Sequence, residues 1–196
     1  MIADRGLECS MLFGMGEWAY YFLGGCLWEG ATRCGKLSLG FRERASGNFA
    51  LLCAMYPAYI VEPIRQETAE IGLRELRTPQ EVEDVIAELK ATGESALFLI
   101  NSVCGCSAAS ARPAIARALR HATRPKRLYS VFAGVDKEAT ETLRRYLAPH
   151  PPSSPSIALW AGGKLVHFIP RHEIEGRSPE VIALALTALF DEYCAA

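Results

Sequence analysis

The pattern of apolar and polar positions changes character near residue 55. Residues 1–54 hold many apolar and aromatic side chains, but they show neither a sustained helical period nor a strand period. From Met55 onward, periodic segments with recognisable caps and turns follow one another to the end of the chain. We therefore predict a folded domain over 55–196 and an irregular N-terminal extension over 1–54, either disordered or the product of a misplaced translation start.

A metal-binding or membrane-docking role is the alternative for this extension. Its apolar stretch over 11–30 is interrupted by Glu17 and Glu29, and the uninterrupted run is too short to span a bilayer. Its four cysteines include no closely spaced pair of the structural-zinc type: Cys9, Cys26, Cys34 and Cys53. Both observations favour an extension without a site of its own.

The first half of the domain predicts two helices and a buried strand. Apolar positions over 57–72 indicate an amphipathic helix that Pro63 interrupts and that ends near Gly72. The sequence Thr78-Pro79-Gln80-Glu81 then combines an N-cap hydroxyl, a proline at the first helical position and a glutamate that can reach back, which predicts a helix to about Lys90. The apolar run Ser95 to Asn101 is typical of a strand covered on both faces.

The second half alternates in the same way. Its periods and turns predict helices at 108–122, 137–147 and 178–194, and strands at 128–132, 156–160 and 164–169, the last two joined by a Gly162-Gly163 hairpin turn. In the last helix, Val181, Ile182, Leu184, Ala185, Leu189 and Phe190 are predicted to cover one sheet face. This order is that of thioredoxin-like proteins. We therefore predict an α/β fold with a central mixed sheet of about four strands flanked by helices.

Composition narrows the classes of partner. The chain has 196 residues, half of them hydrophobic, which suits one globular domain. Its formal net charge is −1, so the field of the whole molecule attracts neither nucleic acid nor an anionic membrane, and neither is expected as a partner. Seven cysteines without a paired framework favour a reducing compartment, and we predict a cytoplasmic protein.

The sequence Cys104-Gly105-Cys106 carries the candidate chemistry. Two thiols between a buried strand and a helix lie where free backbone N–H groups and the helix dipole favour thiolate. We assign Cys104, nearer the strand, as the nucleophile, and Cys106 as the resolving thiol. Gly105 adds no side chain, so an incoming disulfide can approach. The pattern predicts a thiol-disulfide oxidoreductase that works as an exchanger or isomerase rather than as a strong reductant.

Three alternatives stay open for the same two sulfurs. They could be buried structural cysteines, they could belong to a non-catalytic interaction module, or they could ligate zinc or copper(I). No second cysteine or histidine pair lies near them in sequence, although His150, His167 and His172 could approach in space. Redox chemistry is therefore favoured over metal binding, and no metal or tightly bound cofactor is expected.

Three further residues are candidates for supporting or redox roles. Pro155 comes just before a predicted hairpin strand, where thioredoxin-like proteins place a cis peptide bond beside the dithiol. The stretch over 112–127 has several cations and no acidic residue. Arg112 is the candidate for a functional role among these cations, and the others are interpreted as a solvated helix face. Cys194 in the last helix could be a third redox thiol, but the interpretation as a small packing residue is favoured.

Several long and specific segments of the chain together resemble one protein family. They are Met55-Tyr56-Pro57, Pro63-Ile64-Arg65, Asn101-Ser102-Val103-Cys104-Gly105-Cys106, Ala111-Arg112-Pro113, Val131-Phe132-Ala133-Gly134, Asp136-Lys137-Glu138-Ala139-Thr140, Pro151-Pro152-Ser153-Ser154-Pro155-Ser156 and Arg171-His172-Glu173-Ile174-Glu175-Gly176-Arg177. By these segments the chain, over about 55–196, strongly resembles the bacilliredoxin family of thioredoxin-like bacterial proteins. The family pattern begins near Met55, which favours the misplaced-start interpretation of the extension.

The resemblance implies an activity and a co-substrate. Bacilliredoxins remove bacillithiol, a low-molecular-weight thiol, from mixed disulfides on S-thiolated cytosolic proteins. By this resemblance Cys104 forms the mixed disulfide, and Cys106 or another thiol resolves it. Disulfide isomerase activity is also implied, and a general protein disulfide isomerase or reductase is the alternative function.

Overall fold

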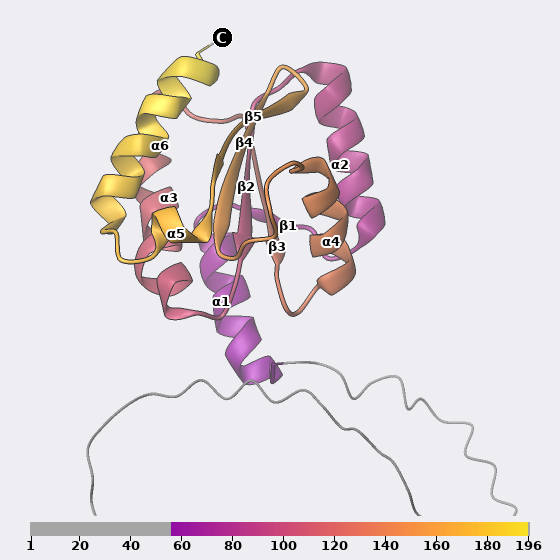
Figure 1. The fold of residues 1–196 in the computed structure, drawn as a ribbon, viewed down its shortest axis with the longest axis vertical. Helices are drawn as coiled ribbons and strands as arrows, with labels where there is room; N and C mark the ends of the chain where they lie inside the picture. The colour runs from indigo at the N-terminus through magenta and orange to yellow at the C-terminus, as the bar shows by residue number, and fades with distance from the viewer. Residues whose placement is uncertain (1–55, 196) are drawn as a thin grey trace, which may run out of the picture. The chain divides into compact units, whose positions relative to one another are not determined.

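The computed structural model describes residues 56–195. The predicted extension over 1–54 lies outside these residues, so the proposed domain division remains a prediction. In the described part, five strands form one mixed sheet with helices on both faces (Figure 1). In chain order the elements are α1 (Ala58–Glu70), β1 (Arg74–Glu75), α2 (Pro79–Thr92), β2 (Ala96–Asn101), the π-helical turn η2 (Ser107–Ala111), α3 (Arg112–Ala118), β3 (Arg127–Phe132), α4 (Lys137–Tyr146), β4 (Ser156–Ala161), β5 (Lys164–Ile169), α5 (Arg171–Ile174) and α6 (Pro179–Tyr193).

The sheet has the strand order β1-β3-β2-β4-β5. β3 is parallel to β1 and β2, whereas β4 is antiparallel to both of its neighbours. This topology confirms the predicted thioredoxin-like fold. The predicted count of about four strands was one too few, because β1 has only two residues and pairs with β3 at Tyr129 and Ser130. Two residues are too few to show a strand period in sequence.

Both faces of the central strand β2 are covered. Phe98 and Ile100 belong to the core beneath α2 and α4, whereas Leu97 and Leu99 belong to the core beneath α3 and α6. Figure 1 shows these two pairs of helices on opposite sides of the sheet. Successive strand side chains point to opposite faces, so a strand between two helical layers needs apolar residues at every position. All six residues of β2 are accordingly buried.

Two predicted helices differ from the structure. The helix predicted over 108–122 begins as the turn η2 and ends at Ala118, where the chain tightens because the N–H of His121 bonds to the carbonyl oxygen of Ala118. In α6, three residues predicted to cover the sheet, Val181, Leu184 and Ala185, are instead exposed. The helix buries the neighbouring stripe of Ile182, Ala183, Leu186 and Phe190.

The termini of α2 follow the sequence prediction closely. The Thr78 hydroxyl accepts the N–H of Glu81, and the Glu81 carboxylate accepts the N–H of Thr78, which forms a complete capping box. The helix is capped at its C-terminus by Gly93, which adopts the left-handed conformation.

Among residues 56–195, neither α2 nor any other helix has the length and apolar character needed to cross a membrane.

Candidate active site

The two cysteines of the Cys-Gly-Cys sequence lie just beyond the end of β2, where the chain turns into η2. Their sulfur atoms are 2.7 Å apart, and both residues are half-buried free thiols. Gly105 lies between them, and a Cβ atom added to it would meet nothing within 4 Å apart from its two chain neighbours. The space above the turn is therefore open to an incoming disulfide.

Hydrogen bonds surround the sulfur of Cys104. Burial disfavours its thiolate, but the Cys106 thiol, the Ser102 hydroxyl and the backbone N–H of Ser107 all bond to this sulfur, and the charge of Arg171 acts on it. The hydroxyl oxygen of Ser102 is 3.0 Å away. Together these donors lower the pKa of Cys104 below its ordinary value in spite of burial.

The environment of Cys106 has the opposite effect. Burial raises the pKa of Cys106, and its hydrogen bond to Cys104 and the negative charge of that sulfur raise it further. The pKa values of the two thiols are therefore displaced in opposite directions, down for Cys104 and up for Cys106. Such a pair titrates as a unit, and the first proton lost belongs mainly to Cys104.

Pro155 lies next to this turn because of the strand register. Ser156, the first residue of β4, pairs with Ile100, the penultimate residue of β2. Pro155 precedes Ser156 and is buried. The Ser154–Pro155 peptide bond is cis, which is the isomer that the position of this proline predicts.

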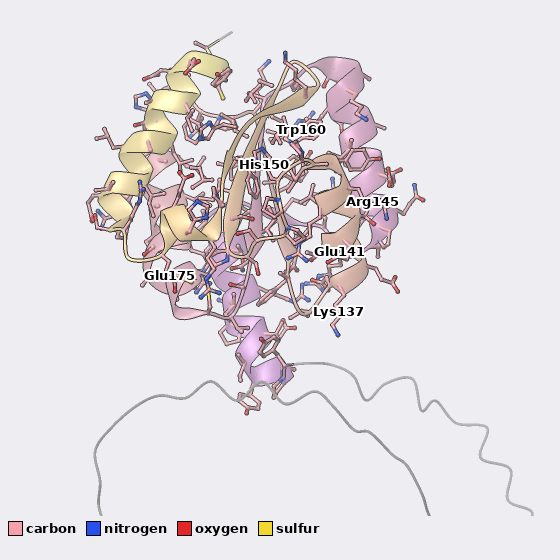
Figure 2. The ribbon with its side chains drawn as sticks, in the orientation of Figure 1. Lys137, Glu141, Arg145, His150, Trp160 and Glu175 are labelled. Carbon is pink, nitrogen blue, oxygen red and sulfur yellow. The ribbon has the colours of Figure 1, made fainter. Side chains whose placement is uncertain are left out.

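The loop before Pro155 also holds Arg171. The hydroxyl of Ser153 accepts the backbone N–H of Arg171 at 2.8 Å, and the hydroxyl of Ser156 donates to the carbonyl oxygen of Ser153 at 2.9 Å. The guanidinium of Arg171 donates two hydrogen bonds of 3.2 Å to the carboxylate of Glu175. Figure 2 shows Glu175 on the side of the sheet away from the helix α4 that carries Lys137. Arg171 is thus the cation whose charge acts to lower the pKa of both thiols.

Arg112 occupies a position that its neighbouring cations do not share. Its side chain is 4% exposed, and one of its terminal nitrogens, Nη1, donates to the Asn101 amide oxygen at 3.3 Å and to the Ser107 hydroxyl at 3.2 Å. Nε of Arg112 lies 2.9 Å from a carboxylate oxygen of Glu67. The cations interpreted as a solvated face are indeed exposed: Arg117, Arg120, Arg124, Lys126 and Arg127.

Sequence reasoning missed the polar residues that flank the dithiol. Asn101, Ser102 and Ser107 contact the cysteines or one another, and Arg171 was named only within a segment that matches the family. One available signal was the cluster of small polar residues on both sides of Cys-Gly-Cys. The run of apolar strand residues ends abruptly at Asn101, and a buried amide there requires hydrogen-bond partners.

The histidines named as metal candidates do not gather at the dithiol. His150 stacks on Phe168 with ring centroids 4.6 Å apart, and with His172 it lines a pocket of about 410 Å³, whereas His167 is exposed on β5. Within residues 56–195, no three or more His, Cys, Asp or Glu side chains come together as a metal site.

Cys194 lies far from the other two described cysteines. It packs at the end of α6 and lines a pocket with Ser95, which precedes β2, whereas the dithiol follows the other end of that strand. The six residues of β2 span about 20 Å. Burial raises the pKa of Cys194. Within one molecule, Cys194 is therefore placed to pack and not to resolve a disulfide on Cys104.

Comparison with known proteins agrees with this arrangement. A family model described as "Disulphide isomerase" matches residues 56–194. A bacilliredoxin of Halalkalibacterium halodurans is 51% identical over 139 residues, which cover 71% of this chain and 94% of that protein. A bacilliredoxin of Cytophaga hutchinsonii is 50% identical over 138 residues, which cover 70% of this chain and 99% of that protein.

The solved structures that match are more distant. Thioredoxin O1 of Arabidopsis thaliana in the oxidised state has a TM-score of 0.44 and 15% identity, over 63% of this chain and 98% of that one. The fold assignment accordingly rests on the sheet topology itself. The family assignment rests on the sequence matches, of which that to the family model covers residues 56–194. The chain belongs to the bacilliredoxin family of thiol-disulfide oxidoreductases.

Proposed function

We propose that this chain removes bacillithiol, or a similar low-molecular-weight thiol, from mixed disulfides on cytoplasmic proteins. In this proposal Cys104 is the nucleophile and Cys106 the resolving thiol. The substrates are S-thiolated proteins, and the low-molecular-weight thiol is a co-substrate rather than a tightly bound cofactor.

The reaction takes two exchanges. The Cys104 thiolate attacks the low-molecular-weight sulfur of the mixed disulfide, a new disulfide forms on Cys104, and the client protein leaves as a thiolate that takes a proton from water. Cys106 then loses its proton and attacks Cys104, which closes the Cys104–Cys106 disulfide and releases the small thiol. Two further thiol groups must then be oxidised to a disulfide, which supplies the two electrons and two protons that restore the dithiol.

The observation that carries the proposal is the opposite pKa displacement of two sulfurs 2.7 Å apart. A lowered pKa increases the thiolate fraction of Cys104, while a raised pKa keeps Cys106 protonated to higher pH. Once Cys104 is bound in a disulfide, its negative charge is gone, and one cause of the raised pKa of Cys106 goes with it. The first exchange therefore activates the second thiol.

Mass spectrometry of the full chain tests this order. A reduced sample is mixed with a bacillithiolated protein and quenched in acid, and the mass added to each cysteine-containing peptide is measured. We expect Cys106→Ser to trap the small thiol on Cys104 and Cys104→Ser to take none. Cys194→Ser serves as the matched control, because its sulfur lies at the other end of β2, and it should react like the wild type. Equal transfer to the Cys104→Ser variant would refute the assignment.

Isomerase activity is a second candidate, favoured by the description of the matching family model. An isomerase attacks a non-native protein disulfide with Cys104 and releases it when a client thiol, rather than Cys106, attacks the mixed disulfide. The Cys106→Ser variant should then keep rescuing a scrambled protein while losing the ability to close its own disulfide. Loss of rescue in this variant would count against isomerisation.

Metal binding remains the alternative function. Closed zinc sites use four ligands, whereas the Cys-Gly-Cys turn supplies two thiolates. A closed zinc site there would need further ligands from another molecule or from residues outside 56–195. Elemental analysis of the purified chain decides between the two: one equivalent of zinc or copper that disappears in Cys104→Ser would favour the metal site over exchange chemistry.

A further inference from the structure

A buried arginine connects the two ends of the dithiol loop. Arg112 is almost fully buried, and a buried guanidinium is stable only when its donors are well paired. Its Nη1 atom donates to Asn101 and to Ser107. Asn101 is the last residue of β2, and Ser107 is the first residue of η2. These two residues bracket the loop that carries Cys104 and Cys106.

The amide oxygen of Asn101 is the centre of this network. It accepts the Ser102 backbone N–H at 2.9 Å, the Ser107 hydroxyl at 2.7 Å and Nη1 of Arg112 at 3.3 Å. The Asn101–Ser107 bond closes the five intervening residues into a small ring. Arg112 contacts both members of that bond, so the guanidinium fixes the two ends of the ring at once.

Ser107 passes this restraint on to the reacting atom. Its side chain is held by Asn101 and Arg112, while its backbone N–H donates to the carbonyl oxygen of Cys104 at 3.1 Å. The same N–H group is among the causes that lower the pKa of Cys104. A shift of Ser107 would therefore move the backbone of Cys104 and change the surroundings of its sulfur.

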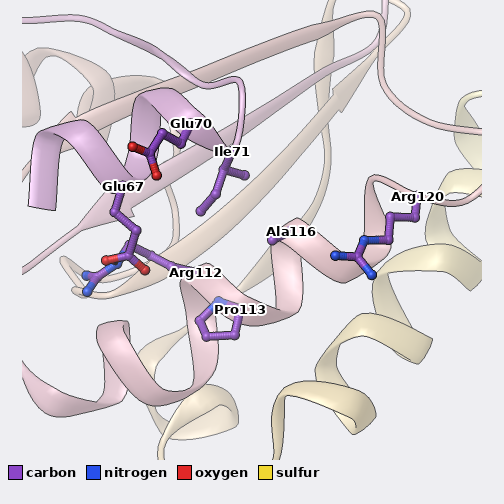
Figure 3. Close-up of a pocket in the computed structure, with 7 residues that line it drawn as sticks. All are labelled: Glu67, Glu70, Ile71, Arg112, Pro113, Ala116 and Arg120. Carbon is purple, nitrogen blue, oxygen red and sulfur yellow. Dashed lines mark ion pairs between the residues drawn. The ribbon is translucent and has the colours of Figure 1, made fainter.

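The charge of Arg112 is compensated on its other side. Glu67 lies 2.9 Å from Nε, and both residues line a pocket of about 370 Å³ between α1 and α3 (Figure 3). That close approach lacks hydrogen-bond alignment, so Nε is a buried donor without a bond. The contact thus compensates charge rather than fixing the orientation of the guanidinium. The orienting bonds are those to Asn101 and Ser107.

We propose that Arg112 is a positioning residue, which acts through Asn101 and Ser107 to hold the loop of Cys104 and Cys106, and with it the Cys104 sulfur, in its reactive position. It contacts neither cysteine and is not a catalytic residue. Its contribution depends on the direction of its hydrogen bonds, because Glu67 offsets its charge and Arg171 is the cation that acts on the Cys104 sulfur. The assignment of Cys104 as the attacking thiol rests on the proposed function.

The test distinguishes the hydrogen-bond geometry of the Arg112 guanidinium from its positive charge. Arg112→Lys keeps the positive charge but cannot reproduce the planar fork. In the full chain, we measure the rate of iodoacetamide alkylation of Cys104 against pH by peptide mass spectrometry, together with the melting temperature. We expect the alkylation midpoint of Arg112→Lys to move to higher pH and its rate at pH 7 to fall about threefold to tenfold, as loss of one hydrogen bond of ordinary strength implies. Arg117→Lys, exposed on the same helix, is the matched control and should behave like the wild type.

A purely structural role predicts a different result. In that case the melting temperature of Arg112→Lys falls while the pH profile of Cys104 stays at the wild-type position, and the proposal is overturned. Ser107→Ala provides a second test that spares the buried charge. It removes the hydroxyl that Arg112 holds but keeps the backbone N–H, and we expect the same upward shift in the profile. No shift in Ser107→Ala would also overturn the proposal. Neither readout uses a bacillithiolated substrate, so failure of the proposed function would not be mistaken for failure of this one.

Discussion

The hydroxyl oxygen of Ser102 lies 3.0 Å from the sulfur of Cys104, and it is the closest side-chain oxygen that this structure assigns to the thiol. Removal of the hydroxyl in Ser102→Ala should raise the pKa of Cys104, because a hydrogen bond to a charged group contributes about 1.5–3 kcal/mol and favours the thiolate. Thiolate absorbance near 240 nm, followed against pH, measures the shift. Ser102→Thr keeps a hydroxyl and should restore most of the wild-type value.

Cys104 and Cys106 should become reactive at different pH values. The pKa of Cys104 is lowered and that of Cys106 is raised, so the thiolate of Cys104 forms first as the pH rises. Alkylation should therefore reach its half-maximal rate at lower pH for Cys104 than for Cys106. Peptide-resolved mass spectrometry of the reduced chain measures both rates. The reverse order would contradict the assigned roles.

Gly105 should matter for access and not for folding. Its backbone does not adopt a left-handed conformation, and an added Cβ meets nothing within 4 Å. Gly105→Ala should therefore keep the wild-type melting temperature. The extra methyl group points into the space that an incoming disulfide must enter, so reduction of a protein mixed disulfide should slow more than reduction of a small one. Equal rates for both substrates in the variant and the wild type would show that Gly105 has no role in access.

Two leucines on α6 should differ sharply in their effect on stability. Leu186 is 1% exposed, whereas Leu184 is 73% exposed. Leu186→Ala leaves a cavity against the sheet and should lower the free energy of unfolding by about 2–5 kcal/mol. Leu184→Ala should change it by less than about 0.5 kcal/mol. Urea denaturation followed by circular dichroism measures both, and a large loss in Leu184→Ala would show that a partner covers this face.

The caps of α2 and α6 offer a similar comparison. The Thr78 hydroxyl is part of a capping box, whereas the side chain of Ser178, at the N-terminus of α6, makes no capping bond. Thr78→Ala should cost about 1 kcal/mol of stability. Ser178→Ala should cost distinctly less in the same denaturation experiment. Equal losses would contradict the capping geometry.

Local patterns in the sequence predicted most of the fold. The capping box at Thr78, the apolar run of β2 and the Gly162-Gly163 turn each depend on a few neighbouring residues, and each lies where it was predicted. The features that were wrong depend on distant partners. β1 exists only through its pairing with β3, and the exposed face of α6 is decided by how that helix rotates onto the sheet.

The same distinction applies to the candidate site. The Cys-Gly-Cys sequence and Pro155 are visible as motifs, and the strand register brings them together. Arg112 was singled out among the cations over 112–127, but its burial beside Glu67, which distinguishes it from Arg117, depends on a residue of α1 far away in the chain and was not predicted. Arg171 is brought to the dithiol by a bond between its backbone and Ser153, which no sequence pattern indicates.

The position of β2 has a consequence for native-state fluctuations. This strand is hydrogen-bonded along both edges, to β3 and β4, while β1 and β5 form the margins of the sheet. Local opening begins where backbone hydrogen bonds are fewest. The strands at the margins of the sheet should therefore exchange their amide protons first, and the central strand last. The reactive thiols follow directly from the centre strand. They should therefore keep their arrangement through partial unfolding events that detach β1 or β5, and redox chemistry should fail only when the domain opens as a whole.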